Sequence, residues 1–296
     1  MKRAIVTGAS GFVGKALVNQ LRKNGYQVFP VSFTNFLQET PRSLPEADIC
    51  IHLAARVHVM NDSHPNPIDE YLRINFEGTK LLADLAYRAG VKRFIYMSTV
   101  KVVAESSLCN KPLTVSTTPA PTDPYAISKL ESENYLLEFA KTSGMEVVVI
   151  RPPLIYGKGV KANFLSLMRA AQKRIPMPFL GIKNLRSLVS LHNLVSFISC
   201  TITHPSAANQ VFFVSDGEDV SIAELYKKIS IAFGILPRVF FVPVFVLRGL
   251  ALVVGKEAAV DRLCESLQVD ISKNKNILDW VPPYSLEEGL SELVRS

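Results

Sequence analysis

A tyrosine and a lysine lie four positions apart in the stretch PTDPYAISKLESENYLLEFA, residues 121–140. Residues at i and i+4 share one face of a helix, so the ammonium of Lys129 can lie beside the phenol of Tyr125, or both can reach one bound molecule. A phenol has a reference pKa of about 10, and a neighbouring ammonium favours its ionised form. The pair therefore has the chemistry of a general acid/base and a cation that tunes it. Two solvent-exposed helix residues are the alternative.

A glycine-bearing stretch, TGASGFVG at 7–14, has the spacing of a dinucleotide-binding turn. It follows an apolar run and opens an amphipathic segment, which is the strand-turn-helix context that this motif needs. Glycines allow the tight bend, the approach of the backbone to a pyrophosphate and the packing of helix on strand, while the helix amino terminus offers N–H donors to the phosphates. We predict that the cofactor is bound by Gly8, Gly11, Phe12, Val13 and Gly14.

Short β-branched runs alternate with helical segments through the first half of the chain, at 3–8, 11–25, 26–33, 47–55, 71–90, 91–99, 124–140 and 145–153. This alternation predicts a doubly wound α/β fold of Rossmann type, with helices on both faces of a parallel sheet. Beyond Gly157 the pattern loosens, with helices expected at 163–174 and 221–233 and a strand at 210–216. We predict a dinucleotide-binding domain carrying the catalytic residues at 1–157. Residues 158–296 are predicted to form a smaller, mainly substrate-binding α/β lobe, with some of its segments packing back onto the first domain.

The composition is that of an ordinary globular chain, with 296 residues, 48% hydrophobic and 20% charged. The formal charge of +7 suits a polyanionic partner, but the basic residues are scattered and no nucleic-acid motif is found. A phosphorylated small molecule accounts for the charge equally well. We therefore expect no nucleic-acid partner.

The first residues and the cysteines bear on the compartment. The amino terminus MKRAIVTGAS lacks the apolar core of a secretory signal, which predicts a cytoplasmic protein. Four cysteines lie far apart without a CxxC pair or a nearby histidine pattern: Cys50, Cys109, Cys200 and Cys264. We expect reduced, mostly buried thiols and no metal site.

One apolar stretch, ILPRVFFVPVFVLRGLALVVG at 235–255, approaches the length of a membrane span. Arg238, Pro243 and Arg248 interrupt it, and no uninterrupted run reaches the roughly 20 apolar residues that a spanning helix needs. We predict buried helices, or a surface packed against the rest of the fold. Weak peripheral contact with a membrane is the alternative.

Eight motifs, spread over nearly the whole chain, together resemble the extended short-chain dehydrogenase/reductase superfamily, in its nucleotide-sugar epimerase and reductase branch. They are TGASGFVG (7–14), IHLAA (51–55), NFEGT (75–79), MSTVKV (97–102), YAISK (125–129), RPPLIYG (151–157), RSLVSLHNL (186–194) and SLEEGL (285–290). The resemblance implies NAD or NADP as cofactor, a nucleotide-sugar substrate and a homodimer.

The same resemblance assigns roles to single residues. Tyr125 matches the general acid/base, Lys129 the cation that lowers the pKa of Tyr125 and holds the nicotinamide ribose, and Thr99 the hydroxyl that bonds the same substrate oxygen. Further expected cofactor contacts are Leu53, Ala54, Ala55 and Asn75, the last also ordering the central helix. Expected substrate contacts are Arg186 at the nucleotide diphosphate, with Asn163 and Arg262 as further contacts. His52 beside the cofactor is expected to be a satisfied core histidine.

Some positions depart from the family pattern. The strand predicted at 26–33 ends without the acid that binds a ribose 2′-hydroxyl, and no arginine follows for a 2′-phosphate, so NAD and NADP both stay open. The short stretch 34–48 leaves little room for the usual third strand and its adenine-contacting acid. Leu154 stands where many UDP-sugar epimerases have an asparagine, which implies different substrate contacts.

The reaction implied is hydride transfer between NAD(P) and C4 of a UDP-linked hexose or N-acetylhexosamine. The runs HLAARVHVMND (52–62) and RPPLIYGKGVKANF (151–164) resemble a subgroup that includes 4-keto-6-deoxy-hexosamine reductases of O-antigen synthesis, which favours ketone reduction. Epimerisation at C4 is the alternative. A catalytically silent dinucleotide-binding protein is a third reading, which the joint presence of Thr99, Tyr125 and Lys129 disfavours.

Overall fold

The computed structural model of the chain describes residues 1–39, 43–57, 66–253, 255 and 257–295. Its strands are β1 (Arg3–Thr7), β2 (Gln27–Val31), β3 (Ile49–His52), β4 (Arg93–Met97), β5 (Glu146–Arg151), β6 (Leu154–Tyr156), β7 (Arg186–Ser190), β8 (Gln210–Phe213) and β9 (Asp219–Val220). Its α-helices are α1 (Phe12–Lys23), α2 (Phe33–Glu39), α3 (Pro67–Tyr71), α4 (Gly78–Arg88), α5 (Pro124–Ser143), α6 (Ala162–Gln172), α7 (Leu191–Thr203), α8 (Ile222–Ala232), α9 (Val244–Val253), α10 (Glu257–Cys264), α11 (Ser272–Leu278) and α12 (Leu286–Arg295). A π-helix, η1 (Leu72–Glu77), and two 3₁₀ turns, η2 (Val100–Val102) and η3 (Pro205–Ala207), complete the elements.

Six parallel strands form the main sheet in the order β2-β1-β3-β4-β5-β8. The chain moves from β1 outward to β2 and then crosses to β3 on the other side of β1. The order therefore reverses between β1 and β3, and in doubly wound sheets ligands bind at such a point, beyond the carboxyl ends of the strands. The predicted fold class is confirmed.

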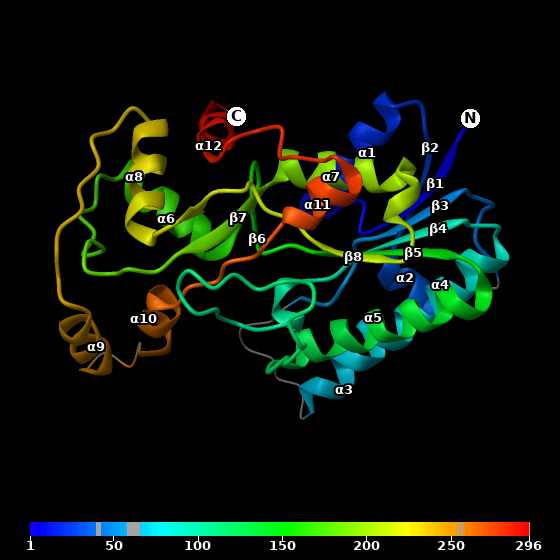
Figure 1. The fold of residues 1–296 in the computed structure, drawn as a ribbon, viewed down its shortest axis with the longest axis horizontal. Coiled ribbons are helices and arrows are strands. Elements are labelled where there is room, and N and C mark those ends of the chain that lie inside the picture. Colours follow the sequence, from blue (N-terminus) through cyan, green and yellow to red (C-terminus); the bar gives the residue numbers. More distant parts are fainter. Residues whose placement is uncertain (40–42, 58–65, 254, 256, 296) are drawn as a thin grey trace.

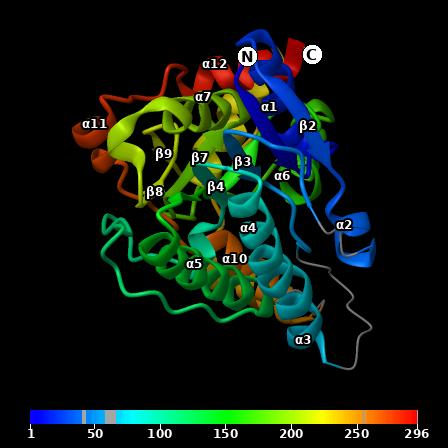
Figure 2. The same cartoon turned by 90° about the vertical axis from the view of Figure 1, so that its right-hand side faces the viewer.

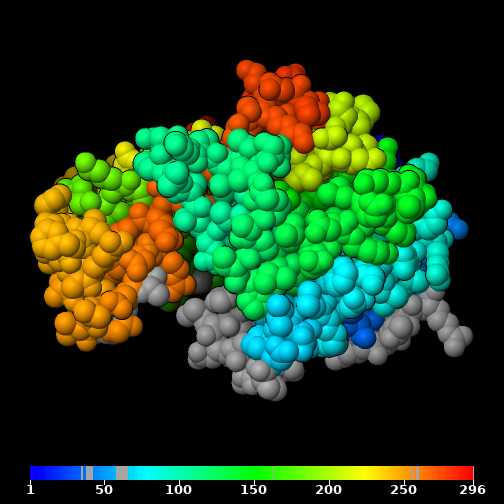
Figure 3. Space-filling model, turned by 60° about the horizontal axis from the view of Figure 1, so that its bottom comes forward, coloured from blue at the N-terminus to red at the C-terminus, as the bar shows by residue number. Residues whose placement is uncertain are grey.

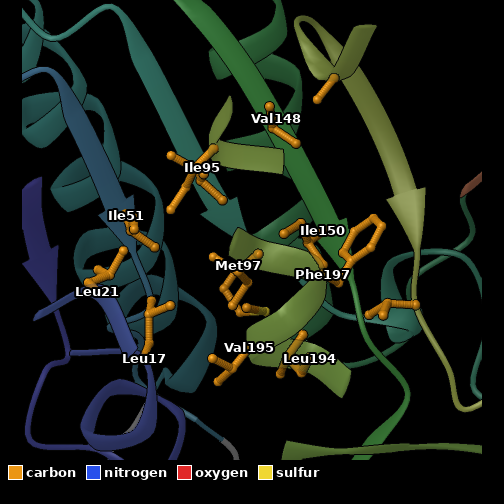
Figure 4. Packing of buried hydrophobic residues seen from close by; sticks show 14 of the residues in the cluster. Leu17, Leu21, Ile51, Ile95, Met97, Val148, Ile150, Leu194, Val195 and Phe197 are labelled. Carbon is orange, nitrogen blue, oxygen red and sulfur yellow. The ribbon is translucent and has the colours of Figure 1, made fainter. Parts of the chain in front are cut away.

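The sheet separates two apolar cores. Successive strand residues point to opposite faces, so Ile95 and Met97 of β4 meet α1 and α7, while Phe94 and Tyr96 meet the layer of α4 and α5. Figure 1 shows these two helical layers above and below the sheet. Figure 4 shows the first core, where Leu17, Leu21, Leu194, Val195 and Phe197 lie near Ile51, Ile95, Met97, Val148 and Ile150.

The second half of the chain builds a smaller unit and also returns to the main sheet. Strands β6, β7 and β9 form a second sheet, and α6, α8 and α12 contribute to an apolar cluster around Tyr156. Strand β8 pairs with β5 in the main sheet, and α7 packs beside α1. Figure 2 shows α7, α11 and α12 gathered over the main sheet on the side opposite α4 and α5. The division at residue 157 stays a prediction.

The short stretch after β2 has the expected consequence. Among the described residues no strand lies beyond β2, which forms the edge of the sheet, and α2 leads from there toward β3. In residues 34–39 and 43–48 the structure has α2 and no strand, in keeping with the little room that the sequence leaves for the usual third strand. Residues 40–42 lie outside the described part, as do residues 58–62 of the run HLAARVHVMND.

The apolar stretch 235–255 differs from the favoured expectation. Its helix α9 buries Ala251, but Phe245, Leu250 and Val253 are 76%, 62% and 84% exposed. The prediction that this stretch is buried is therefore wrong for most of α9, because the helix packs by only one face. Within the described residues, no helix is long and apolar enough to cross a membrane.

Candidate active site

The glycine turn joins β1 to α1 and lies directly against the chain that follows β3. Gly8 has φ +69°, a conformation that favours glycine, and a Cβ there would lie 2.8 Å from the backbone nitrogen of Ala54. A Cβ on Gly14 would lie 2.0 Å from the carbonyl oxygen of Gly8, so only glycine lets α1 pack this closely. The structure thus brings the turn together with Leu53 and Ala54, two other predicted cofactor contacts.

The first turn of α1 is open to an anion. No side chain caps the helix at Gly11, and no acidic residue lies in its first turn. The leading N–H groups of an α-helix have no intrahelical acceptor, and the helix dipole adds partial positive charge there. Gly11 has ordinary φ and ψ, and a Cβ on it would meet only the Gly8 oxygen at 3.1 Å. The fold thus constrains position 11 less than positions 8 and 14, and a pyrophosphate resting on this turn would add a further requirement for glycine.

Two contacts hold the chain around Thr99 against the start of α5. The ammonium of Lys129 donates to the carbonyl oxygen of Met97 at 2.7 Å, two residues before Thr99. The ammonium of Lys101, two residues after Thr99, pairs with the Asp123 carboxylate at 2.8 Å, and Asp123 caps α5 by accepting from the N–H of Ala126. Tyr125 lies between Asp123 and Lys129 on the helix. The same pair of contacts thus flanks Thr99 in its loop and Tyr125 on its helix, and ties the two segments together.

Burial sets the protonation of the Tyr125 and Lys129 side chains. Lys129 is 2% exposed, and burial lowers its pKa to about 7, against a smaller opposite effect of the nearby Glu133 carboxylate. Burial also raises the pKa of the Tyr125 phenol, with Asp123 and Tyr71 acting in the same direction. The expectation that Lys129 lowers the pKa of Tyr125 is therefore wrong for this structure, where loss of hydration dominates. A neutral phenol at this position is a proton donor.

A chain of buried hydrogen bonds connects the glycine turn with α5. The Thr7 hydroxyl donates to Nδ1 of His52 at 2.6 Å, and Nε2 of His52 donates to the Thr79 hydroxyl at 2.9 Å, because the proton of Thr79 goes to the Asn75 carbonyl. This assignment makes His52 a neutral imidazole, and burial holds its pKa well below the usual range. His52 is the satisfied core histidine that was predicted.

Asn75 continues this chain. Its amide accepts from the N–H of Arg56 at 2.8 Å and donates to the carbonyl of Arg56 and to the hydroxyl of Ser128, which itself donates to the carbonyl of Tyr125. Asn75 is 1% exposed, and both ends of its amide bond protein groups. It therefore positions the loop after β3 and the start of α5, in line with the expected ordering role, while its contact with the cofactor stays a prediction.

The sequence did not predict the buried ion pair between Glu133 and Arg151, one helical turn from Lys129. Glu133 follows Lys129 by one helical turn, and its carboxylate accepts from Nε of Arg151 at 3.0 Å, with both residues buried. The spacing of Lys129 and Glu133 would have revealed that they share a face. Nothing in the sequence signals that Arg151, at the end of β5, lies opposite.

The predicted substrate contacts fall into two groups. Arg186 donates to the backbone carbonyls of Arg262 and Glu265, so Arg186 and Arg262 come together at one end of β7. The residues after Cys264 also pair with the chain that follows Thr99, since Ser107 donates its N–H to Ser266 at 2.7 Å. Asn163 is exposed near the start of α6. Across the described residues, no cluster of side chains could hold a metal ion.

Residues 4–223 match the NAD dependent epimerase/dehydratase family. The chain belongs to this family. It is 43% identical to a UDP-glucose 4-epimerase of Vibrio cholerae over 312 residues, covering 100% of this chain and 95% of that protein. It is 30% identical to a GDP-6-deoxy-D-mannose reductase of Pseudomonas aeruginosa, covering 77% of this chain and 79% of the reductase.

The fold agrees with this membership. The crystal structure of a UDP-N-acetylglucosamine 4-epimerase from Bacillus cereus superposes with a TM-score of 0.79 at 19% identity, covering 100% of both chains. As a member of the epimerase/dehydratase family, the protein is an enzyme that uses a nicotinamide dinucleotide. The glycine turn and the open start of α1 fit the pyrophosphate of that cofactor.

Proposed function

We propose that the protein transfers a hydride between NAD(P) and C4 of a UDP-linked hexose or N-acetylhexosamine. The observation that carries this is the pair of contacts, Lys129 to Met97 and Lys101 to Asp123, that ties the chain around Thr99 to the start of α5, where Tyr125 lies. A threonine hydroxyl and a tyrosine phenol would together suit a carbonyl or alcohol oxygen, with Tyr125 exchanging the proton while the cofactor exchanges the hydride.

Two arginines support a substrate that carries a diphosphate. Arg186 lies at the end of β7 beside Arg262, and a guanidinium offers paired N–H donors that match phosphate oxygens. Burial lowers the pKa of Arg186 because the guanidinium loses hydration there. A dianionic partner would therefore be stabilised by a positive charge that water screens only weakly. The 43% identity to a UDP-glucose 4-epimerase supports a nucleotide sugar as that partner.

Net reduction of a 4-keto sugar is the direction we favour, of the type that converts UDP-4-keto-6-deoxy-N-acetylglucosamine into UDP-N-acetylquinovosamine. A reductase must exchange its cofactor at every turnover, and β2 at the sheet edge leaves fewer groups to grip the adenosine end. The neutral Tyr125 phenol is the form that a reductase needs, since it gives a proton to the ketone oxygen. A role in O-antigen synthesis would follow from this product.

Epimerisation at C4 is the second candidate, and the similarity to the UDP-glucose 4-epimerase of Vibrio cholerae favours it. An epimerase takes the hydride from C4 and returns it to the other face of the same sugar. It consumes no cofactor and gains from holding one NAD through many turnovers.

One experiment separates the two reactions. We expect the purified protein to carry little bound NAD and to oxidise NADH or NADPH in equal amount with added UDP-4-keto-6-deoxy-N-acetylglucosamine, followed by nicotinamide absorbance. Mass spectrometry of retained ligands would report the cofactor, and the Tyr125→Phe variant controls for contaminating reductases. A protein loaded with NAD that interconverts UDP-glucose or UDP-N-acetylglucosamine with the galacto epimer, without change in absorbance, would establish the epimerase instead.

A further inference from the structure

The chain from Arg238 to Val253 carries an exposed apolar surface that the proposed reaction does not use. The surface, called here the α9 face, consists of Phe240, Phe241, Phe245, Val246, Leu250, Leu252 and Val253, all more than a third exposed. Figure 3 shows this segment in yellow and orange at one end of the molecule, beside α10. Seven adjacent apolar side chains, three of them phenylalanine, exceed the scattered exposure that is normal on a protein surface.

The geometry of α9 explains why these side chains stay in water. Val244, Leu247 and Ala251 recur at i, i+3 and i+7 and pack toward the fold. At about 100° per residue, the exposed Phe245 and Leu250 lie on the opposite arc of the helix. Apart from Arg248 and Gly249 the helix is apolar around its circumference, whereas the fold covers only one side.

The α9 face continues onto a neighbouring strip of chain. The N–H of Met177 donates to Arg238 at 2.9 Å, and the N–H of Leu180 donates to Phe240 at 3.2 Å, so residues 177–183 run beside residues 238–242. Leu180 is itself 43% exposed. The apolar surface is therefore broad and is backed by two paired segments.

The charges within the two segments that form the α9 face are positive, while the neighbouring α10 carries Glu257 and Asp261. The stretches 177–183 and 238–253 contain three basic residues and no acidic one: Lys183, Arg238 and Arg248. All three are exposed, and Arg248 pairs with Asp261 of α10 at 3.0 Å. Within the described residues, Lys183 and Arg238 have no carboxylate partner. Exposed aromatic and aliphatic side chains with cations at their margin are the composition of a surface that rests on anionic lipid.

We propose that the α9 face docks the protein on an anionic phospholipid membrane. Helix α9 has 10 residues, about 15 Å of helix, which is half the roughly 30 Å hydrocarbon core of a bilayer. It therefore lies in the plane of the interface, with Phe245 and Leu250 in the acyl boundary and Arg238 and Lys183 at the phosphates. A second copy of the chain fits less well, because two-fold pairing of this face would bring its cations against their own equivalents.

The test is flotation of the full-length protein with phosphatidylcholine vesicles, with and without phosphatidylglycerol. We expect binding that requires phosphatidylglycerol and weakens at about 1 M salt, where the Debye length falls to about 3 Å. The double variant Phe245→Ser, Leu250→Ser should lower the vesicle partition coefficient at least about 100-fold, from the loss of two large apolar side chains. Replacing Lys183 and Arg238 by glutamine should lower it roughly fivefold for each cation.

A matched control uses two exposed apolar residues away from the α9 face. Ile231 at the end of α8 is 64% exposed and Val281 is 55% exposed, so Ile231→Ser, Val281→Ser removes similar apolar surface without touching the segment. Cofactor titration and thermal unfolding establish that each variant is folded. The proposal is overturned if wild-type protein does not float, if the α9 variant floats like wild type, or if that variant loses self-association in sedimentation while vesicle binding is unchanged.

Discussion

Helices α5 and α9 both depart from the usual distribution of side chains, in which charged groups are exposed and large apolar groups are buried. Helix α5 buries charged groups, and α9 exposes large apolar ones. Beneath α5, Lys129 and Glu133 are 2% and 1% exposed, whereas on α9, Phe245 and Val253 are 76% and 84% exposed. A buried polar group or a large exposed apolar patch is more informative than the ordinary arrangement. Each buried group of α5 finds a partner inside the fold, so the protein itself satisfies that region. The exposed apolar side chains of the α9 face have no such partner inside the fold, so a partner that covers them must come from outside the chain.

The largest effect that the α5 region can show is chemical. The substitution Tyr125→Phe removes the transferable proton and keeps the ring, so turnover should fall by roughly 100-fold to 10,000-fold, as is typical of losing a general acid/base. The measurement is the rate of nicotinamide absorbance change with saturating substrate. Cofactor affinity should be preserved, because the phenyl ring still fills the site.

Thr99→Val provides the matched comparison for Tyr125→Phe. It keeps the shape of the side chain and removes only its hydroxyl, so it should also lower turnover while leaving cofactor affinity unchanged. Wild-type turnover in both variants would show that the Thr99 and Tyr125 hydroxyls take no part in the reaction, whereas no turnover in the wild-type protein itself would favour a catalytically silent dinucleotide-binding protein.

The next effect is on stability. Replacing Glu133 by glutamine leaves the Arg151 guanidinium buried at 5% exposure without its counter-charge, which should lower the free energy of unfolding by about 3–5 kcal/mol. Chemical denaturation measures this. Glu131→Gln on the exposed side of the same helix is the control, with a change within about 0.5 kcal/mol. Equal midpoints for the two variants would mean that burial of the ion pair is unimportant.

A smaller effect concerns pH. Burial lowers the pKa of Lys129 to about 7, from about 10.4 in an unfolded chain. Above pH 7 the folded protein without cofactor loses the ammonium proton, and a site that holds ribose hydroxyls with an ammonium must regain it. We expect cofactor affinity to fall by up to about tenfold per pH unit above 7, with proton uptake on binding.

Calorimetry at pH 8, in two buffers of different ionisation enthalpy, counts the protons taken up. The Lys129→Met variant should bind the cofactor more weakly and without this pH dependence. An affinity that is constant from pH 6.5 to 8.5 in the wild-type protein would contradict the assignment. For stability the same shift has the opposite sign: between pH 7 and 10 the unfolded chain binds the additional proton, so the folded state gains stability as pH rises.

The sequence predicts the main sheet well because its signals are local. Glycine is required at 14 because a side chain would collide with Gly8, and at 8 because a side chain would collide with the loop after β3. The alternation of Phe94, Ile95, Tyr96 and Met97 between the two faces follows from strand geometry alone. The hydrogen-bond chain from Thr7 to Tyr125 is different, because its members come from five elements and each residue type is common elsewhere. Such a network is defined by the packing of α4 on α5, which no spacing reveals.

The two errors have a shared physical origin. An apolar run predicts burial only if the fold has surface to cover it, and α9 meets too little to cover more than Val244, Leu247 and Ala251. Likewise the ammonium of Lys129 is expected to lower the pKa of the Tyr125 phenol, but burial penalises the phenolate and also lowers the pKa of Lys129 itself, and this loss of hydration is the larger effect. Both errors concern how much water reaches a side chain, which the sequence alone does not give.

The smallest expected effect completes the comparison between α5 and α9. Leu250 is 62% exposed, so Leu250→Ser removes little that the fold buries, and the free energy of unfolding should change by less than about 0.5 kcal/mol. Leu136→Ser on α5 is the matched substitution at a fully buried position, where the loss of the side chain should cost several kcal/mol, about 2–5 for leucine replaced by a smaller residue. Chemical denaturation of both variants gives the two values. If Leu250→Ser destabilises the protein as much as Leu136→Ser, the α9 face is covered by the fold in solution, and the contrast between the two helices does not exist.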